Sequence, residues 1–125
     1  MFLADDPVVG QWPNDLVDRG ELVIASVTDI YGPDRLVAAT SQRETFATAL
    51  AEALSEGYTG IRVAADNSSL IDTPERLQAW LAWEEVADRF MAENPVNGLC
   101  AFDRTRVEAA TLTEVMGSHH VSMSD

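Results

Sequence analysis

The chain has 125 residues, 46% of them apolar, which is enough for one globular domain with its own core and too few for two. Its 21 acidic residues outnumber eight basic ones, and the net charge of −13 disfavours binding to nucleic acid or to an anionic membrane surface. All eight basic residues are arginines, so no lysine can form a Schiff base or bind phosphate in a phosphate loop.

The first part of the chain predicts two strands with a helix between them. Residues 1–4 are apolar and predict a short strand. Residues 13–19 predict a short helix that Gly20 ends, and residues 21–27 are a run of strand formers. Residues 31–34 contain glycine and proline and predict a turn. Because an apolar strand rarely starts at the first residue, we expect the N-terminal part of the domain to be missing.

The clearest helix lies in the middle of the chain. Ser41 and Glu44 have the spacing of a capping box, and apolar residues recur at helical spacing from Phe46 until Gly57 ends the helix. Strand-forming residues follow directly. We expect the next strand over residues 59–65.

Two further helices and two strands complete the predicted order. Residues 73–92 predict a helix, with Thr73 as its N-cap and a proline in its first turn. The next strand ends at Phe102. A last helix over residues 105–116 and a short final strand over residues 119–123 follow.

Strands that alternate with helices require right-handed crossovers, which favour a mainly parallel sheet with helices on both faces. The predicted fold class is therefore α/β. Asp66 and Asp103 each come at the end of a strand that a helical stretch follows. Ligands of open α/β sheets bind beyond the carboxyl ends of the strands, so we expect a site near these two aspartates.

Two charged residues fall at positions that the pattern assigns to the interior. Glu84 lies within the apolar stripe of the helix over residues 73–92, and Arg62 lies in the middle of a strand. An unpaired buried charge is very costly, so we expect Arg62 and Glu84 to form a structural ion pair between helix and sheet. A ligand-contacting role for Glu84 and a solvated position at the sheet edge are the alternatives.

Cys100, His119 and His120 are the remaining candidates for chemistry. Cys100 lies in a strand, where cysteine usually acts as a small buried apolar residue. A single cysteine with a remote histidine pair matches a zinc site poorly, and no oxyanion-hole loop accompanies a cysteine nucleophile. Glycine-rich phosphate motifs and a hydrolase elbow are also missing from the sequence. We therefore expect no catalytic residue, no bound metal and no cofactor.

The sequence gives no indication of export or of membrane insertion. No apolar run approaches the ~20 residues of a membrane-spanning helix, and no basic segment leads into an apolar signal core. One cysteine cannot form an internal disulfide. We expect a cytoplasmic protein.

Three segments of the chain, taken together, resemble one known family. They are the run from Gly57 to Val63 with Asp66 after it, the aromatic–glutamate pair Trp83-Glu84, and Cys100-Ala101-Phe102-Asp103-Arg104-Thr105-Arg106. This combination resembles the MEDS domain, a sensory module of prokaryotic signal-transduction proteins. His119 falls where that family ends its last helix with a histidine. The family's opening strand and histidine-bearing N-terminal motif are missing here.

The resemblance implies an α/β fold similar to the RecA and KaiC class, without a phosphate loop. It also implies a sensory role, proposed for simple hydrocarbon derivatives. The family occurs beside histidine-kinase modules or STAS-type anti-sigma-factor-antagonist modules, which implies a bacterial regulator with a kinase or anti-sigma factor as its partner.

We therefore expect a single MEDS-like domain over residues 1–125 that works as a non-catalytic sensory or regulatory module. Its predicted pocket for a small apolar ligand lies above the strand ends and includes Asp66, Glu84, Cys100, Asp103 and His119. The alternatives are a protein-interaction module of an anti-sigma-factor network that binds no small ligand and, more remotely, a small hydrolase or metal enzyme. We also expect a homodimer, because an exposed sheet edge invites pairing with a second chain.

Overall fold

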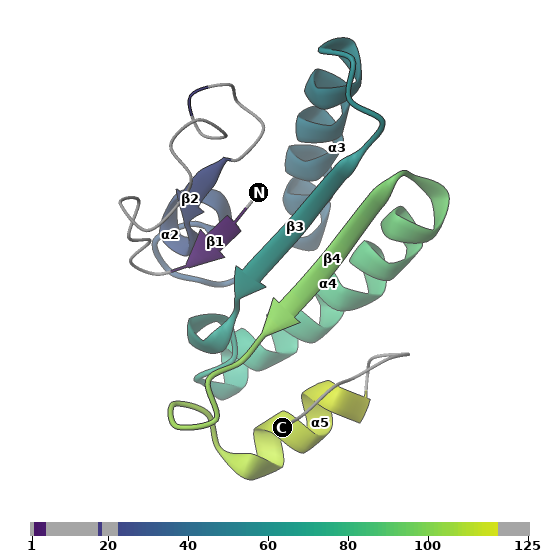
Figure 1. Cartoon of the computed structure of the whole chain (residues 1–125). Helices are drawn as coiled ribbons and strands as arrows, with labels where there is room; N and C mark the ends of the chain where they lie inside the picture. The colour runs from purple at the N-terminus through teal and green to yellow at the C-terminus, as the bar shows by residue number, and fades with distance from the viewer. Residues whose placement is uncertain (1, 5–17, 19–22, 118–125) are drawn as a thin grey trace.

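The computed structural model describes residues 2–4, 18 and 23–117 (Figure 1). Within these residues, one parallel sheet has the strand order β2-β1-β3-β4. Its strands are β1 (Phe2–Ala4), β2 (Ile24–Ser26), β3 (Ile61–Asp66) and β4 (Val96–Ala101). The predicted parallel α/β fold is confirmed.

Helices follow the strands along the chain. Between β2 and β3 lie α2 (Val27–Tyr31) and α3 (Ala39–Ser55). A single 3₁₀ turn, η2 (Ser68–Leu70), and the long helix α4 (Pro74–Glu93) connect β3 to β4. The helix α5 (Ala109–Gly117) follows β4.

The start of α4 agrees with its prediction from the sequence. Thr73 is the N-cap, and its Oγ1 accepts a hydrogen bond from the backbone N–H of Arg76 at 3.2 Å. Pro74 occupies the first helical position, where its missing N–H would have had no helical partner. These two residues fix where α4 begins and therefore which of its side chains face the sheet.

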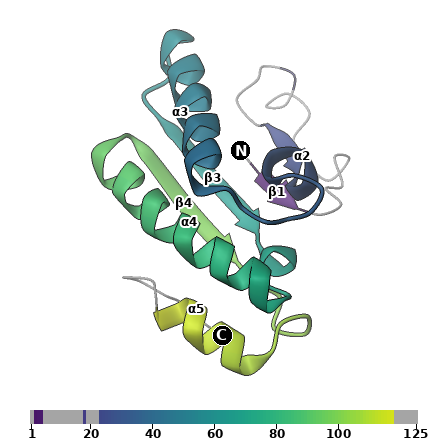
Figure 2. The same cartoon turned by 180° about the vertical axis from the view of Figure 1, so that it is seen from behind.

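α3 and α4 pack against each other on one face of the sheet (Figure 2). Phe46 of α3 and Trp83 of α4 stack with ring centroids 5.8 Å apart. Trp80 is completely buried and meets Phe102, just after β4, edge-on at 5.5 Å. Each such aromatic pair adds roughly 0.5–1.5 kcal/mol beyond the burial of the rings. The aromatic side chains thus hold α4 in place against α3 and the end of β4.

The other face of β3 and β4 is open in the described structure. Side chains alternate between the two faces along each strand, and Arg62, Asn97 and Leu99 on this face are exposed. The prediction that Arg62 lies inside is therefore wrong. The prediction assumed that helices cover both faces of the sheet, whereas α3 and α4 cover one face.

The strand predicted over residues 21–27 is shorter in the structure. Residues 19–22 lie outside the described part, β2 starts at Ile24, and Val27 already belongs to α2. Ser26 causes this early change, because its Oγ accepts a hydrogen bond from the N–H of Asp29 and so caps the helix.

Two predicted helix starts are also wrong. α3 begins at Ala39, so Ser41 lies in its first turn and does not cap it; the carbonyl of Ser41 accepts a hydrogen bond from Thr45 Oγ1. The last helix begins at Ala109 rather than at residue 105. The predicted helix over residues 13–19, except for residue 18, and the predicted strand over residues 119–123 lie outside the described residues.

Gly60 allows the start of β3 to approach the turn before β4. The N–H of Ile61 donates a hydrogen bond to the carbonyl of Pro95 at 3.0 Å. A Cβ on Gly60 would lie 2.3 Å from the same carbonyl oxygen. Because a backbone oxygen cannot move away without breaking this hydrogen bond, only glycine fits here.

We predict that Gly60→Ala lowers the free energy of unfolding by about 1–3 kcal/mol, the usual cost of forcing an extra carbon into a packed site. Urea denaturation followed by circular dichroism measures the change. Gly117→Ala is the matched control, because a Cβ at Gly117 meets nothing within 4 Å. An unchanged denaturation midpoint for Gly60→Ala would contradict the close approach.

Candidate functional site

A cavity of about 60 Å³ lies between α4 and the sheet, and we name it the inner cavity. Its floor is formed by β3 and β4 through Val63, Ala65 and Cys100, and its roof by α4. Gly98 of β4 and Met91 of α4 also line the cavity, and a Cβ on Gly98 would lie 3.1 Å from the Met91 sulfur.

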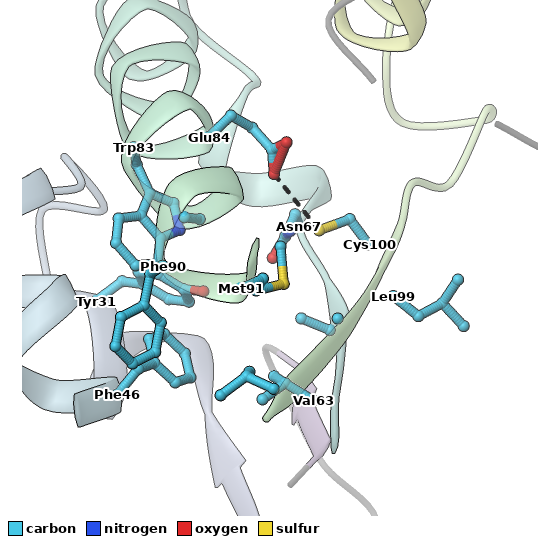
Figure 3. Close-up of a pocket in the computed structure, with 14 residues that line it drawn as sticks. Tyr31, Phe46, Val63, Asn67, Trp83, Glu84, Phe90, Met91, Leu99 and Cys100 are labelled. Atoms are coloured by element: carbon cyan, nitrogen blue, oxygen red, sulfur yellow. Dashed lines mark hydrogen bonds between the residues drawn. The ribbon is translucent and has the colours of Figure 1, made fainter. Parts of the chain in front are cut away.

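Aromatic rings form one side of the inner cavity (Figure 3). They belong to three different helices: Tyr31 of α2, Phe46 of α3, and Trp83 and Phe90 of α4. All four residues are buried. A change in the contents of the cavity therefore alters the side-chain packing of α2, α3 and α4 together.

The opposite side of the inner cavity is polar (Figure 3). The Cys100 thiol donates to Glu84 Oε1 across 3.9 Å, and the nearby Asn67 side chain lowers the pKa of Cys100 and so partly opposes its rise. Asn67 is only 2% exposed, and within the described structure its Oδ1 atom accepts no hydrogen bond. A buried acceptor without a donor costs roughly 1–3 kcal/mol. The inner cavity therefore contains an oxygen suited to a donor from a ligand.

Burial changes the acidity of the groups around the inner cavity. Burial, with a smaller contribution from the nearby Asp88 carboxylate, raises the pKa of Glu84 to about 7. Burial and the charge of Glu84 raise the pKa of the Cys100 thiol to about 12. The pKa of the Tyr31 phenol is also raised well above its ordinary value, mainly by burial. Near neutral pH, Glu84 is thus the group here that changes its charge.

A second polar cluster lies where β3 and β4 end. Asp66 Oδ1 accepts hydrogen bonds from the N–H of Ser68 at 3.1 Å and from its hydroxyl at 2.7 Å. The same Ser68 hydroxyl oxygen accepts from the N–H of Asp103 at 2.8 Å. Asp103 Oδ1 in turn accepts from the N–H and hydroxyl of Thr105, which lower the pKa of Asp103. Ser68 therefore joins the two strand ends.

The two aspartates also border an open hollow of about 370 Å³ on the exposed face of the sheet, together with Leu99 and Phe102. Their carboxylates already accept hydrogen bonds from neighbouring side chains and backbone. Such bonds stabilise the loops after β3 and β4, and they account for aspartate at both strand ends.

The structure divides the predicted site residues into two groups. Glu84 and Cys100 meet in the inner cavity, whereas Asp66 and Asp103 meet through Ser68 at the strand ends. His119 lies outside the described residues.

The predicted ion pair is corrected by the alternation of side chains along β3. Val63 and Ala65 face α4 and line the inner cavity, so Arg62 projects from the opposite face. Glu84 is buried on the α4 side. The sheet therefore lies between the side chains of Arg62 and Glu84.

Asn67 and Tyr31 are cavity residues that the sequence did not reveal. Asn67 directly follows Asp66, and its position after the end of a strand is the only signal that could have suggested it. Tyr31 lies next to a Gly-Pro turn, where an aromatic residue gives no indication that it is buried. Both depend on contacts with α4 and β4, which are distant in sequence.

Across the described ranges, no three histidine, cysteine, aspartate or glutamate side chains come close enough to hold a metal ion. Cys100 is a thiol rather than a nucleophilic thiolate at neutral pH because of its raised pKa. In the same described ranges, no helix is long and apolar enough to span a membrane.

The described structure is thus a parallel α/β domain with a partly open, mainly apolar cavity beside the buried Glu84. The family model described as "MEDS: MEthanogen/methylotroph, DcmR Sensory domain" matches residues 9–120 of the chain. The chain therefore belongs to this family of sensory domains. No curated protein and no solved structure matches the chain significantly.

We predict that Glu84→Gln becomes more stable relative to the unchanged protein as the pH rises. The difference between their free energies of unfolding should change by about 3 kcal/mol between pH 4 and pH 8. Folding raises the Glu84 pKa from its ordinary 4.5 to about 7, so its favourable contribution is full below pH 4.5 and is lost by about pH 7. Urea denaturation at several pH values measures the difference. Parallel pH profiles for the two proteins would contradict a buried, protonated Glu84.

Proposed function

We propose that the chain senses a small, mainly apolar molecule that binds in the inner cavity. Membership of a sensory family supports a signalling role. The observation that carries the proposal is the combination of an aromatic wall with the buried Asn67 Oδ1, which accepts no hydrogen bond within the described structure. Such a site favours a ligand with an apolar body and one polar hydrogen-bond donor.

The size of the inner cavity limits the ligand. A volume of about 60 Å³ accommodates roughly four to six water-sized groups at about 10–15 Å³ each. The ligand is therefore a molecule of a few non-hydrogen atoms, in line with the simple hydrocarbon derivatives that the family resemblance implies.

A ligand in the inner cavity contacts elements that are far apart in the chain. Its walls come from α2, α3, α4, β3 and β4. A ligand shifts a conformational equilibrium only through contacts that differ between the two states. Repacking of Tyr31 and Trp83 around the ligand would move α2 relative to α4 and carry the signal to a partner.

The partner in this proposal is a regulatory protein such as a histidine kinase or an anti-sigma factor. The net charge of −13 favours a basic binding surface on that partner. We also propose a cytoplasmic location, where reducing conditions keep the Cys100 thiol free.

We predict that at least one compound from a panel of C1–C4 alcohols, amides and amines shifts the indole N–H signal of Trp83 in a ¹⁵N NMR titration. Ala87→Leu fills the cavity from α4 and should abolish the shift. Ala82→Leu adds the same atoms to an exposed position of α4 and should preserve it. A protein that responds to no compound of the panel would refute sensing through this cavity.

Self-association is the second part of the proposal, and the exposed face of β4 favours it. Leu99 is 58% exposed on this face. This is the largest exposed fraction among the large apolar side chains of the described residues. No strand of the described part pairs with the outer edge of β4. An apolar side chain beside an open edge favours contact with a second copy.

We predict a homodimer at physiological salt, with twice the mass of one chain in light scattering at micromolar concentration. Leu99→Asp should shift the population to the monomer, because it places a charge at the contact. Leu54→Asp, at an exposed position of α3, is the matched control and should leave the dimer intact. A monomeric parent protein would exclude this part of the proposal.

A further inference from the structure

We propose that the ligand of the inner cavity is a small organic cation, an alkylammonium ion, whose N–H groups bind Glu84 and Asn67 while its alkyl part contacts the aromatic wall. This inference rests on the proposed function and adds the chemical class of the ligand. It follows from the hydrogen-bonding groups, the rings and the charges around the cavity.

The polar side of the cavity offers acceptors to a ligand. Asn67 Oδ1 is buried and accepts no hydrogen bond within the described structure, and the Glu84 carboxylate lies beside it in the same lining. The Cys100 thiol directs its hydrogen toward Glu84. An ammonium group has several N–H donors and no acceptor, so it complements this side better than a hydroxyl group, which has a single donor.

The aromatic wall suits the alkyl part and the charge of the same ligand. Faces of Trp, Tyr and Phe rings attract cations, and rings grouped around a cavity are a common way to bind alkylated ammonium ions. The protein already contains such a contact at this wall: the guanidinium carbon of Arg43 lies 5.3 Å from the centroid of the Phe90 ring.

The charges that face Glu84 favour a cation. Asp88 on α4 adds a negative charge near Glu84 and helps to raise its pKa, whereas the neighbouring Cys100 of β4 and Tyr31 of α2 have raised pKa values and stay neutral between pH 6 and pH 8. Arg43 of α3 is a cation at this wall, where it contacts the Phe90 ring. The net charge of −13 also attracts cations to the protein from solution.

The proposal predicts a specific dependence on pH. Glu84 has a pKa of about 7 when the cavity holds no ligand, and a cation binds the ionised carboxylate. An alkylammonium ion remains protonated at both pH 6 and pH 8, since amines of this type titrate near pH 10. Affinity should therefore be roughly tenfold higher at pH 8 than at pH 6.

Isothermal titration calorimetry with propylammonium chloride at pH 6 and pH 8 tests this directly. Sodium chloride at equal concentration controls for ionic strength, and 1-propanol is the neutral analogue of nearly the same size. We expect propylammonium to bind at least tenfold more tightly than 1-propanol at pH 8, and we expect little pH dependence for the alcohol.

Two variants separate the role of Glu84 from the effect of total charge. Glu84→Gln keeps the shape of the side chain, and it should lower propylammonium affinity at pH 8 at least tenfold and abolish its pH dependence. Glu85→Gln removes one negative charge from the neighbouring exposed position and should preserve both. Circular dichroism confirms that each variant is folded.

The outcomes distinguish the two proposals. Equal binding of 1-propanol and propylammonium, or cation binding that Glu84→Gln leaves unchanged, would overturn the cation and leave a neutral ligand in the same cavity. If neither propylammonium nor 1-propanol binds, and no other compound of the panel does, both the cation and the sensory use of this cavity are overturned.

Discussion

The parallel pairing of β3 with β4 is the constraint on which the rest of the structure depends. Its register runs from Ile61 opposite Val96 to Asp66 opposite Ala101, and side chains alternate between the faces along both strands. Ala65 and Cys100 are partners in this register and line the inner cavity together. A slip of one residue would turn Cys100 to the exposed face. The close approach of Gly60 to Pro95 holds the register at its first pair.

Glu84 occupies a position where an apolar residue would pack more easily. It follows Trp83, which anchors α4 to α3 through the stack with Phe46, so the helix cannot rotate to expose the carboxyl group without losing that stack. A raised pKa and a thiol contact are the consequences. Costly polar groups in a core commonly mark functional positions, and this supports the choice of Glu84 for the ligand proposal.

The sequence predicted the elements that depend on local signals. Thr73 and Pro74 marked the start of α4 because a side-chain cap and a proline act within one turn. Helical spacing also placed Glu84 inside. The prediction was wrong where two local signals competed. Residues 21–27 are strand formers, but Ser26 caps α2 and ends the strand there. It was also wrong for Arg62, because the cover of a sheet face depends on how distant helices pack.

The sequence by itself determined the four described strands, the helices α3, α4 and α5, the parallel α/β class and the buried position of Glu84, since periodicity and caps act over a few residues. Only the tertiary structure decided which residues share a site. Asn67, Glu84 and Cys100 come from three separate segments and meet in one cavity, whereas Asp66 and Asp103 meet elsewhere through Ser68. Strand register and the direction of each side chain decide on which side of the sheet a residue lies, and neither can be read from spacing in the sequence.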